Sequence, residues 1–339
     1  MKSKSDASKA IGAALVLCTT LSFAAVAHAS PHNGSVDDSN IRYIGRWDHS
    51  VPGNAHSNWG GAYLRVRFTG SSIGVRAFDI MYQIDGGPYE QGHSLVGVTL
   101  KPGVHTLLLG SIGQNYEVDF EGLILDPGAV TLPVKKRPII EFVGDSITTG
   151  GGQTVPPTVN YAWDTAEALG ADHTQIAFSA RALTTGFGCA DDKAGLDNQY
   201  FKLENFNHLS DKTQRPWDFS YKPRIVVINL GQNDQCGQEP KQTFEESYVS
   251  FVQRIRAKLP NAHIVAVQPF SGAYADSVRD AVSLLTEGGV KGVSTISTAG
   301  WLAKSDFVDG IHPNQSGHAK VAAQLEPILK LILSARPNK

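Results

Sequence analysis

The 339-residue sequence has no strong excess of either charge and only one long run of apolar residues. Its 30 basic and 32 acidic residues give a formal net charge of −2, which offers no electrostatic basis for binding nucleic acid or an anionic membrane surface. The apolar run ends near residue 26, and no later stretch is long enough to cross a bilayer. With 41% hydrophobic and 18% charged residues, the whole sequence has a composition typical of a soluble globular protein.

The sequence also lacks the spacing of a metal site or of a phosphate-binding loop. His312 and His318 are six residues apart, rather than the four that would align them on one helical face, and no acidic cluster accompanies them. Gly150-Gly151-Gly152 lacks the lysine of a phosphate loop. We therefore predict no metal and no cofactor.

The first thirty residues have the pattern of a secretory signal peptide. Three lysines and an apolar run from residue 11 to residue 26 precede Ala27-His28-Ala29, which offers a small-x-small cleavage site. An apolar run of about 16 residues, interspersed with Ala, Ser and Thr, is too short for a membrane span. We predict a signal peptide over residues 1–29, cleavage after Ala29, and a secreted or periplasmic protein that does not stay in the membrane.

Cysteine is scarce, with three residues in the whole chain. Cys18 lies in the predicted signal peptide, so Cys189 and Cys236 remain, an even number in a chain bound for an oxidising compartment. Composition leaves two alternatives open: a disulfide bond between them, or two separate buried thiols.

The first part of the mature chain, to about residue 125, predicts β-structure. Leu64-Arg65-Val66-Arg67-Phe68 alternates apolar and polar residues with a period of two, as does the run at 116–121. Short antiparallel strands at this spacing are typical of a β-sandwich or jelly roll, which we place at residues 30–133. The expected turns lie at Gly70-Ser71-Ser72, Asp85-Gly86-Gly87-Pro88 and Lys101-Pro102-Gly103.

From residue 134 to residue 339 the pattern changes to alternating strands and helices. Helical patterns include one that we expect to begin with a capping box at Thr243-Phe244-Glu245-Glu246, and a final helix over about 315–333. This order predicts an α/β domain with a doubly wound parallel sheet and helices on both faces. The expected strands, apolar and rich in β-branched residues, lie at 139–143, 175–178, 225–230 and 264–267.

Three polar segments follow predicted strands or precede the final helix, at the edge of the sheet where ligands bind in such folds. Ser146 is the candidate nucleophile, His312 the base that takes its proton, and Asp309 the carboxylate that fixes the imidazole. The backbone N–H of Ser146 and the side-chain amide of Asn233 are candidate oxyanion donors. Each residue alone has a plainer explanation as a turn or cap, but the three segments in this order predict a serine esterase. They are Gly144-Asp145-Ser146, Gly231-Gln232-Asn233-Asp234 and Asp309-Gly310-Ile311-His312-Pro313.

These segments resemble the first, third and fifth sequence blocks of the SGNH (GDSL-type) hydrolases, over roughly residues 137–339. In the β-rich part, Arg42-Tyr43-Ile44-Gly45-Arg46 and Trp59-Gly60-Gly61 are also similar to carbohydrate esterase family two. Members of that family join a jelly roll to an SGNH domain and remove acetyl groups from plant-wall polysaccharides. The resemblance implies an SGNH-type doubly wound sheet preceded by an all-β jelly-roll domain, and an acetylated polysaccharide or oligosaccharide, such as acetyl-xylan or acetyl-glucomannan, as substrate.

The second block of the family departs from its pattern in this chain. The family usually carries a glycine there, whose N–H is a third oxyanion donor, whereas this chain has Ser179-Ala180-Arg181-Ala182-Leu183. Alanine keeps the N–H, provided that its backbone angles suit a side chain, so the resemblance makes Ala180 the third donor. Cys189 follows this block and Cys236 follows Asn233, so a disulfide that ties the two loops is one hypothesis and two unconnected thiols is the other.

Two aromatic residues precede Asp309 on the expected active-site loop. Trp301 and Phe307 are candidates for stacking on a sugar ring, although such residues also serve as core. Two further functions stay open. One is a lipase or lysophospholipase with the same chemistry and longer acyl chains, and the other is a non-catalytic carbohydrate-binding protein, which only Ala180 favours.

Overall fold

The computed structural model describes residues 32–151, 157–212 and 214–335. The predicted signal peptide at residues 1–29, with Cys18, lies outside these ranges. Within them, no helix has both the length and the apolar character that a membrane crossing requires. The residues in these ranges belong to one compact unit, in which an antiparallel region precedes an α/β region.

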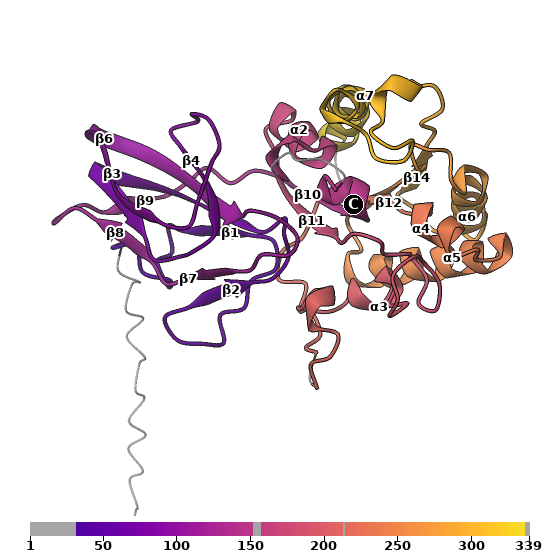
Figure 1. Cartoon of the computed structure of the whole chain (residues 1–339), viewed down its shortest axis with the longest axis horizontal. Helices are drawn as coiled ribbons and strands as arrows, with labels where there is room; N and C mark the ends of the chain where they lie inside the picture. The colour runs from indigo at the N-terminus through magenta and orange to yellow at the C-terminus, as the bar shows by residue number, and fades with distance from the viewer. Residues whose placement is uncertain (1–31, 152–156, 213, 336–339) are drawn as a thin grey trace, which may run out of the picture. The chain divides into compact units, whose positions relative to one another are not determined.

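The antiparallel region is built on a sheet that runs in the order β1-β3-β6-β4-β5, with β8 and β9 paired to β3, and on a separate pair of strands, β2 and β7 (Figure 1). The period-two alternation in the sequence is confirmed, because Leu64, Val66 and Phe68 are fully buried while Arg67 is exposed. The strands are β1 (Arg42–Ile44), β2 (Ala55–Ser57), β3 (Tyr63–Val75), β4 (Ile80–Ile84), β5 (Glu90–Gly92), β6 (Leu95–Ser111), β7 (Val118–Phe120), β8 (Leu123–Leu125) and β9 (Thr131–Leu132).

Two of the three expected turns in this region are wrong. Gly70-Ser71-Ser72 lies inside β3 and Lys101-Pro102-Gly103 inside β6, where the pairing of the two strands shifts register. Such an irregularity leaves backbone donors out of the ladder, and here the carboxylate of Asp126 accepts the Ser71 N–H at 2.6 Å and the Ser72 N–H at 3.1 Å. The turn expected at residues 85–88 is confirmed, between β4 and β5.

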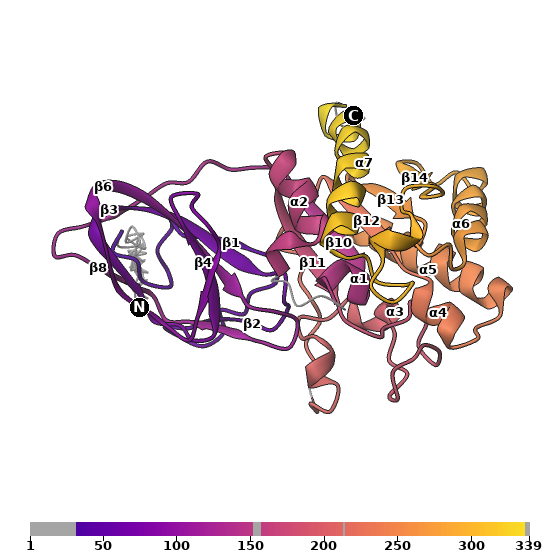
Figure 2. The ribbon, with the colours of Figure 1, turned by 45° about the horizontal axis from the view of Figure 1, so that its top comes forward.

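In the described part of the α/β region, five parallel strands form a sheet in the order β11-β10-β12-β13-β14 (Figure 2). The chain starts in β10, crosses to β11 on one side, and then returns to β12 on the other. The switch point of such a sheet lies between β10 and β12, at their carboxyl ends. The strands are β10 (Ile139–Gly144), β11 (Asp172–Ala177), β12 (Ile225–Asn229), β13 (His263–Val267) and β14 (Val293–Ile296).

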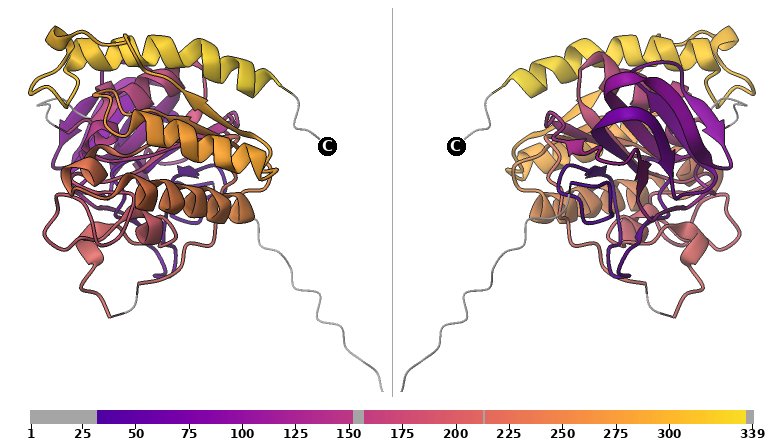
Figure 3. Two further views of the ribbon diagram at one scale, coloured as in Figure 1. Left: turned by 90° about the vertical axis from the view of Figure 1, so that its right-hand side faces the viewer. Right: turned by 90° about the vertical axis from the view of Figure 1, so that its left-hand side faces the viewer.

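Helices cover both faces of this sheet, as the sequence predicts. Ile225 and Val227 of β12 pack in a cluster with residues of α2 and α7, whereas Val226 and Ile228 pack in a second cluster with residues of α5 and α6. Figure 3 shows α7 and α5 on opposite sides of the sheet. The helices are α1 (Ser146–Thr149), α2 (Tyr161–Ala168), α3 (Leu196–Gln199), α4 (Gln232–Cys236), α5 (Lys241–Lys258), α6 (Ala275–Glu287) and α7 (Gln315–Ser334).

The expected capping box at Thr243-Phe244-Glu245-Glu246 is wrong. Helix α5 begins at Lys241, with Pro240 as its N-cap residue, so Thr243 already lies inside the helix. Proline suits a helix start, because it has no N–H to leave unpaired and its fixed φ, here −60°, fits the entry to a helix. The final helix matches its prediction closely, since α7 spans Gln315–Ser334.

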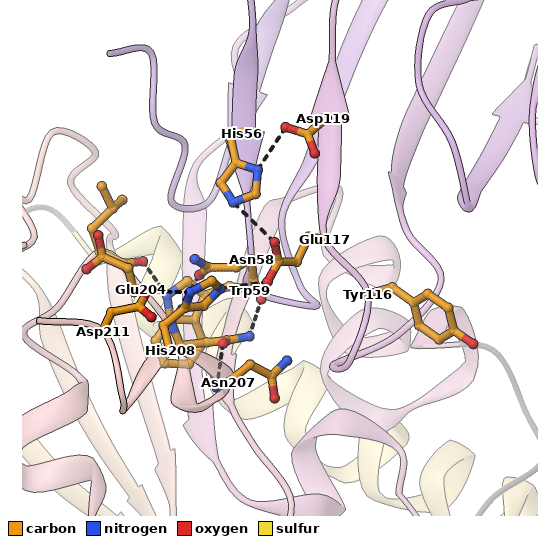
Figure 4. Close-up of polar contacts among 12 residues, drawn as sticks. His56, Asn58, Trp59, Tyr116, Glu117, Asp119, Glu204, Asn207, His208 and Asp211 are labelled. Carbon is orange, nitrogen blue, oxygen red and sulfur yellow. Dashed lines mark hydrogen bonds and ion pairs between the residues drawn. The ribbon is translucent and has the colours of Figure 1, made fainter. Parts of the chain in front are cut away.

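Many polar contacts join the antiparallel region to the α/β region, and two sets of ion pairs are among them. In the first, Asp172 at the start of β11 accepts Arg42 Nε at 2.8 Å and Arg65 Nη1 at 2.6 Å. In the second, the Glu117 carboxylate lies between two imidazoles, 3.5 Å from His56 Nε2 and 2.6 Å from His208 Nε2 (Figure 4). The ion pairs at Asp172 also explain why β11 starts three residues earlier than its apolar run predicts.

Candidate active site

Ser146 stands at the carboxyl end of β10, where the chain turns sharply into α1. Gly144, the last residue of the strand, has no room for a side chain, because a Cβ there would lie 2.0 Å from Thr148 Oγ1. Asp145 is the N-cap of α1, and its Oδ1 accepts the Ile147 N–H at 2.9 Å. This cap gives Asp145 a structural role and leaves Ser146 at the rim of the sheet.

The structure brings Ser146, His312 and Asp309 together in a hydrogen-bonded chain. Ser146 Oγ lies 2.8 Å from His312 Nε2, and His312 Nδ1 lies 2.7 Å from Asp309 Oδ2. A carboxylate accepts the Nδ1 proton, so the neutral ring presents Nε2 as the acceptor for the serine hydroxyl. This polarity suits removal of the Ser146 proton.

Asp309 is held in place by its own loop rather than by a helix. Its Oδ1 accepts the backbone N–H groups of Ile311 at 2.9 Å and of His312 at 2.8 Å. The bond from the His312 N–H is the largest cause that lowers the pKa of Asp309, to about 2. Asp309 therefore stays ionised at any pH at which the imidazole could act as a base.

The three expected oxyanion donors are the N–H groups of Ser146 and Ala180 and the side-chain amide of Asn233. Within the described residues, neither the Ser146 N–H nor the Ala180 N–H donates to another group of the chain. Asn233 lies in α4, which follows β12, and its Nδ2 donates to Asp145 Oδ2 at 3.0 Å. An amide nitrogen carries two hydrogens, so this bond orients the group and leaves one hydrogen for a ligand.

Ala180 has the backbone conformation that the family's glycine would favour. Its φ is +62°, in the left-handed region, which for a residue with a Cβ is unfavourable by roughly 1–2 kcal/mol. The replacement of glycine by alanine therefore leaves a left-handed backbone conformation at this position. Contacts on both sides of the residue must hold it there.

The loop after Ala180 is fastened to α4 in two ways. The Asp234 side chain, fully buried, accepts with Oδ1 the N–H groups of Leu183 at 2.8 Å and of Thr184 at 3.2 Å. Cys189 and Cys236 form a disulfide bond, with Cα atoms 6.0 Å apart, so the structure shows the first of the two cysteine alternatives. No pattern in the sequence predicts these partners of Asp234.

Burial raises the pKa of Asp145 to about 6, against the lowering effect of its bond from the Ile147 N–H. The carboxyl is fully enclosed, with an exposed fraction of 1%. Since it accepts both the Ile147 N–H and Asn233 Nδ2, it links the turn of the nucleophile to one oxyanion donor.

The two aromatic candidates for sugar binding are half-buried against the α2 and α7 side of the core. Phe307 pairs with Pro313, the neighbour of His312, and so lies beside the catalytic candidates. The contacts of Trp301 are with the hydrophobic core. Both residues pack against the same core cluster, and their binding of sugar stays a prediction.

His318 is a core residue in this structure. Its Nδ1 accepts the Tyr161 N–H at 3.2 Å, its ring stacks on that of Tyr161, and burial lowers its pKa to about 4. Among the residues that the structure describes, no group of three or more His, Cys, Asp or Glu side chains is arranged to hold a metal ion.

A serine, a histidine and a carboxylate joined in this order at the switch point of a parallel sheet define a site of the serine-hydrolase class. The chain belongs to the GDSL-like lipase/acylhydrolase family, whose model matches residues 142–320. The resemblance to the SGNH hydrolases is thereby confirmed for the α/β region.

Curated relatives and solved structures extend the likeness into the antiparallel region. The chain is 31% identical over 263 residues to cellulase/esterase CelE of Acetivibrio thermocellus, covering 67% of this chain and 31% of CelE. It is 27% identical over 230 residues to an acetylxylan esterase/glucomannan deacetylase of Cellvibrio japonicus, covering 58% of this chain and 62% of that protein. The chain thus spans about a third of the first relative and under two thirds of the second.

The fold of the chain is similar to that of a family two carbohydrate esterase from Clostridium thermocellum, solved in complex with cellohexaose. The TM-score is 0.73 and the sequence identity 26%, with 86% of this chain and 99% of that chain covered. The resemblance to carbohydrate esterase family two is confirmed by this likeness.

Proposed function

We propose that the chain is a serine esterase that removes O-acetyl groups from plant-type polysaccharides or their oligosaccharides, such as acetyl-xylan and acetyl-glucomannan. The observation that carries the proposal is the hydrogen-bonded chain from Ser146 Oγ through His312 to Asp309. The names of the curated relatives support a sugar acetate as the ester.

In the first half of the reaction, Ser146 Oγ attacks the acetyl carbonyl carbon while its proton passes to His312 Nε2. The carbonyl oxygen becomes an oxyanion, which accepts hydrogen bonds from the N–H groups of Ser146 and Ala180 and from Asn233 Nδ2. Removal of one such donor typically lowers kcat by about 100- to 1000-fold. The intermediate then collapses, the C–O bond to the sugar breaks, and the sugar oxygen takes the proton from His312.

In the second half, water attacks the acetyl group on Ser146 and gives one proton to His312. The second tetrahedral intermediate expels Ser146 Oγ, which recovers that proton, and acetate leaves. Asp309 stays ionised throughout and stabilises the imidazolium that forms twice in each cycle.

Release of acetate from acetyl-xylan and acetyl-glucomannan by the Ser146→Ala variant tests the proposal. We expect the rate to fall to background, a loss on the order of 10⁵-fold or more, because the nucleophile is gone. Ser283→Ala is a matched control, since that serine lies on an exposed turn of α6 and bonds only within its own helix. Acetate release that survives in Ser146→Ala would remove the nucleophile assignment.

The same assay format separates the proposal from its two alternatives. A lipase or lysophospholipase would prefer octanoyl and longer aryl esters to acetyl esters, and that preference would overturn the sugar-acetate proposal. A non-catalytic carbohydrate-binding protein would bind the glycan, yet an organophosphonate would not label its Ser146.

We also propose that the chain acts outside the cytoplasm. The support is the pattern of residues 1–29, with its charged start, apolar run and Ala27-His28-Ala29 site. N-terminal sequencing of the protein recovered from an exporting host should begin at Ser30. A mature chain that retains residues 1–29 would contradict this proposal.

A further inference from the structure

Gln114 lies in the antiparallel region, between β6 and β7, yet its side chain binds a residue of the α/β region. Its Oε1 accepts the Ser179 N–H at 2.8 Å, and its Nε2 donates to Ser179 Oγ at 2.8 Å. One amide group therefore fixes both the backbone and the side chain of Ser179. Ser179 directly precedes Ala180, the residue whose N–H is one of the three oxyanion donors.

The Ser179 hydroxyl lies close to the nucleophile. A Cβ placed on Gly151 would be 2.9 Å from Ser146 Cβ and 3.2 Å from Ser179 Oγ, so both atoms flank the same small space. Gly151 also donates its N–H to the Ser146 carbonyl at 2.6 Å. The Gln114 amide thus holds a segment that lies against the turn of the nucleophile itself.

Two glycines allow the loop that contains Gln114 to lie close to the α/β region. A Cβ on Gly60 would lie 2.7 Å from Gln114 Cα, and a Cβ on Gly61 would lie 2.5 Å from the Gln175 nitrogen in β11. Neither position has room for a side chain. Because β11 ends at Ala177, just before Ser179, the two glycines bring the loop and the strand together at the edge of the site.

We propose that Gln114 is a positioning residue for the esterase reaction, which holds the Ser179–Ala180 peptide in the left-handed turn that presents the Ala180 N–H to the oxyanion. The inference rests on the proposed function. Ala180 is strained at its φ of +62°, and the strain has to be offset by contacts that exist only in the folded chain. Gln114 supplies two of them before Ala180, and Asp234 supplies two after it, through Leu183 and Thr184.

The test compares three variants by their kcat and KM on an acetyl ester. In Gln114→Ala both bonds to Ser179 are lost, and we expect kcat to fall about 10- to 100-fold with KM nearly unchanged, because a misplaced donor weakens only the transition state. In Gln114→Glu we expect kcat close to that of the wild type, since a carboxylate accepts the Ser179 N–H and the hydroxyl can turn to donate. Gln83→Ala, in β4 of the same region, is the control that should leave kcat unchanged.

The outcomes separate this inference from the proposed function. Suppose that the wild type is active, that Ser146→Ala abolishes this activity, and that Gln114→Ala keeps a kcat within twofold of the wild type. That result would overturn the role of Gln114 and leave the proposed function standing. An equal loss of kcat in Gln114→Ala and Gln114→Glu would do the same, because it would show that only the fold depends on the residue. If the wild type proves inactive, the NMR amide signal of Ala180 still decides, since it should move in Gln114→Ala and not in Gln83→Ala.

Discussion

The disulfide between Cys189 and Cys236 allows a prediction of stability with a magnitude. The two cysteines are 47 residues apart, and the chain-entropy relation for a closed loop of that length gives about 4 kcal/mol. We expect the Cys189→Ser/Cys236→Ser double variant to lose about that much free energy of unfolding. A domain is typically stable by about 5–15 kcal/mol, so the loss is a large fraction of the total.

The effect on activity should be smaller than the effect on stability. The disulfide ties the loop after Ala180 to α4, but Asp234 ties the same two segments through the Leu183 and Thr184 N–H groups. With one of the two ties left, we expect kcat at 25 °C to fall by less than about tenfold.

Denaturant unfolding followed by tryptophan fluorescence measures this prediction, on the wild type and on the double variant, each with and without reductant. The reductant should destabilise the wild type to the level of the variant and leave the variant unchanged. A difference below about 1 kcal/mol between the two proteins would refute the entropic reasoning. An oxidised wild type that yields two free thiols on mass mapping would refute the bond itself.

Three other changes have expected outcomes. Asp309→Asn should lower kcat by roughly 100- to 10⁴-fold, less than Ser146→Ala, because the Asp309 side chain is 49% exposed and water can solvate part of the imidazolium; acetate-release kinetics measure this. Ala180→Gly should keep kcat and change the free energy of unfolding by less than about 1 kcal/mol, since relief of the left-handed strain is offset by the entropy of glycine, whereas Ala180→Val should lower both. The Asp145 carboxyl has a folded-state pKa raised to about 6, so its contribution to stability is full below about pH 4 and is lost as the pH rises through 6. Urea unfolding between pH 4 and pH 7 should show the wild type losing up to about 3 kcal/mol relative to Asp145→Asn.

Much of the candidate site could be predicted from the sequence because its residues follow strand ends. Carboxyl ends of parallel strands meet at one edge of a sheet, so Ser146 after β10 and Asn233 after β12 had to lie near each other once the strands were recognised. His312 and Asp309 are three residues apart, which local chain geometry alone can bring into contact. The structure adds the loop bonds that fix their orientation.

The parts of the fold that escaped prediction are those where polar residues are paired inside the molecule. Asp172, His173 and Thr174 broke the apolar run of β11, yet all three are buried, and Asp172 is neutralised by two arginines more than 100 residues earlier in the chain. Strand β14 was missed because Ser294 and Thr295 occupy its middle. A local sequence pattern carries no information about a partner more than 100 residues away, as the two arginines are from Asp172.

The contact between Gln114 and Ser179 is of the same kind, since the two residues are 65 positions apart and belong to different regions of the chain. It changes what the antiparallel region contributes to the site. A chain without that region would lose Gln114, and it would also lose the arginines that neutralise the buried Asp172. Its inactivity would therefore not distinguish a lost glycan-binding surface from a collapsed oxyanion site. The single change Gln114→Ala distinguishes the two causes. It leaves the antiparallel region and its ion pairs with Asp172 in place, and it removes only the amide that bonds to Ser179.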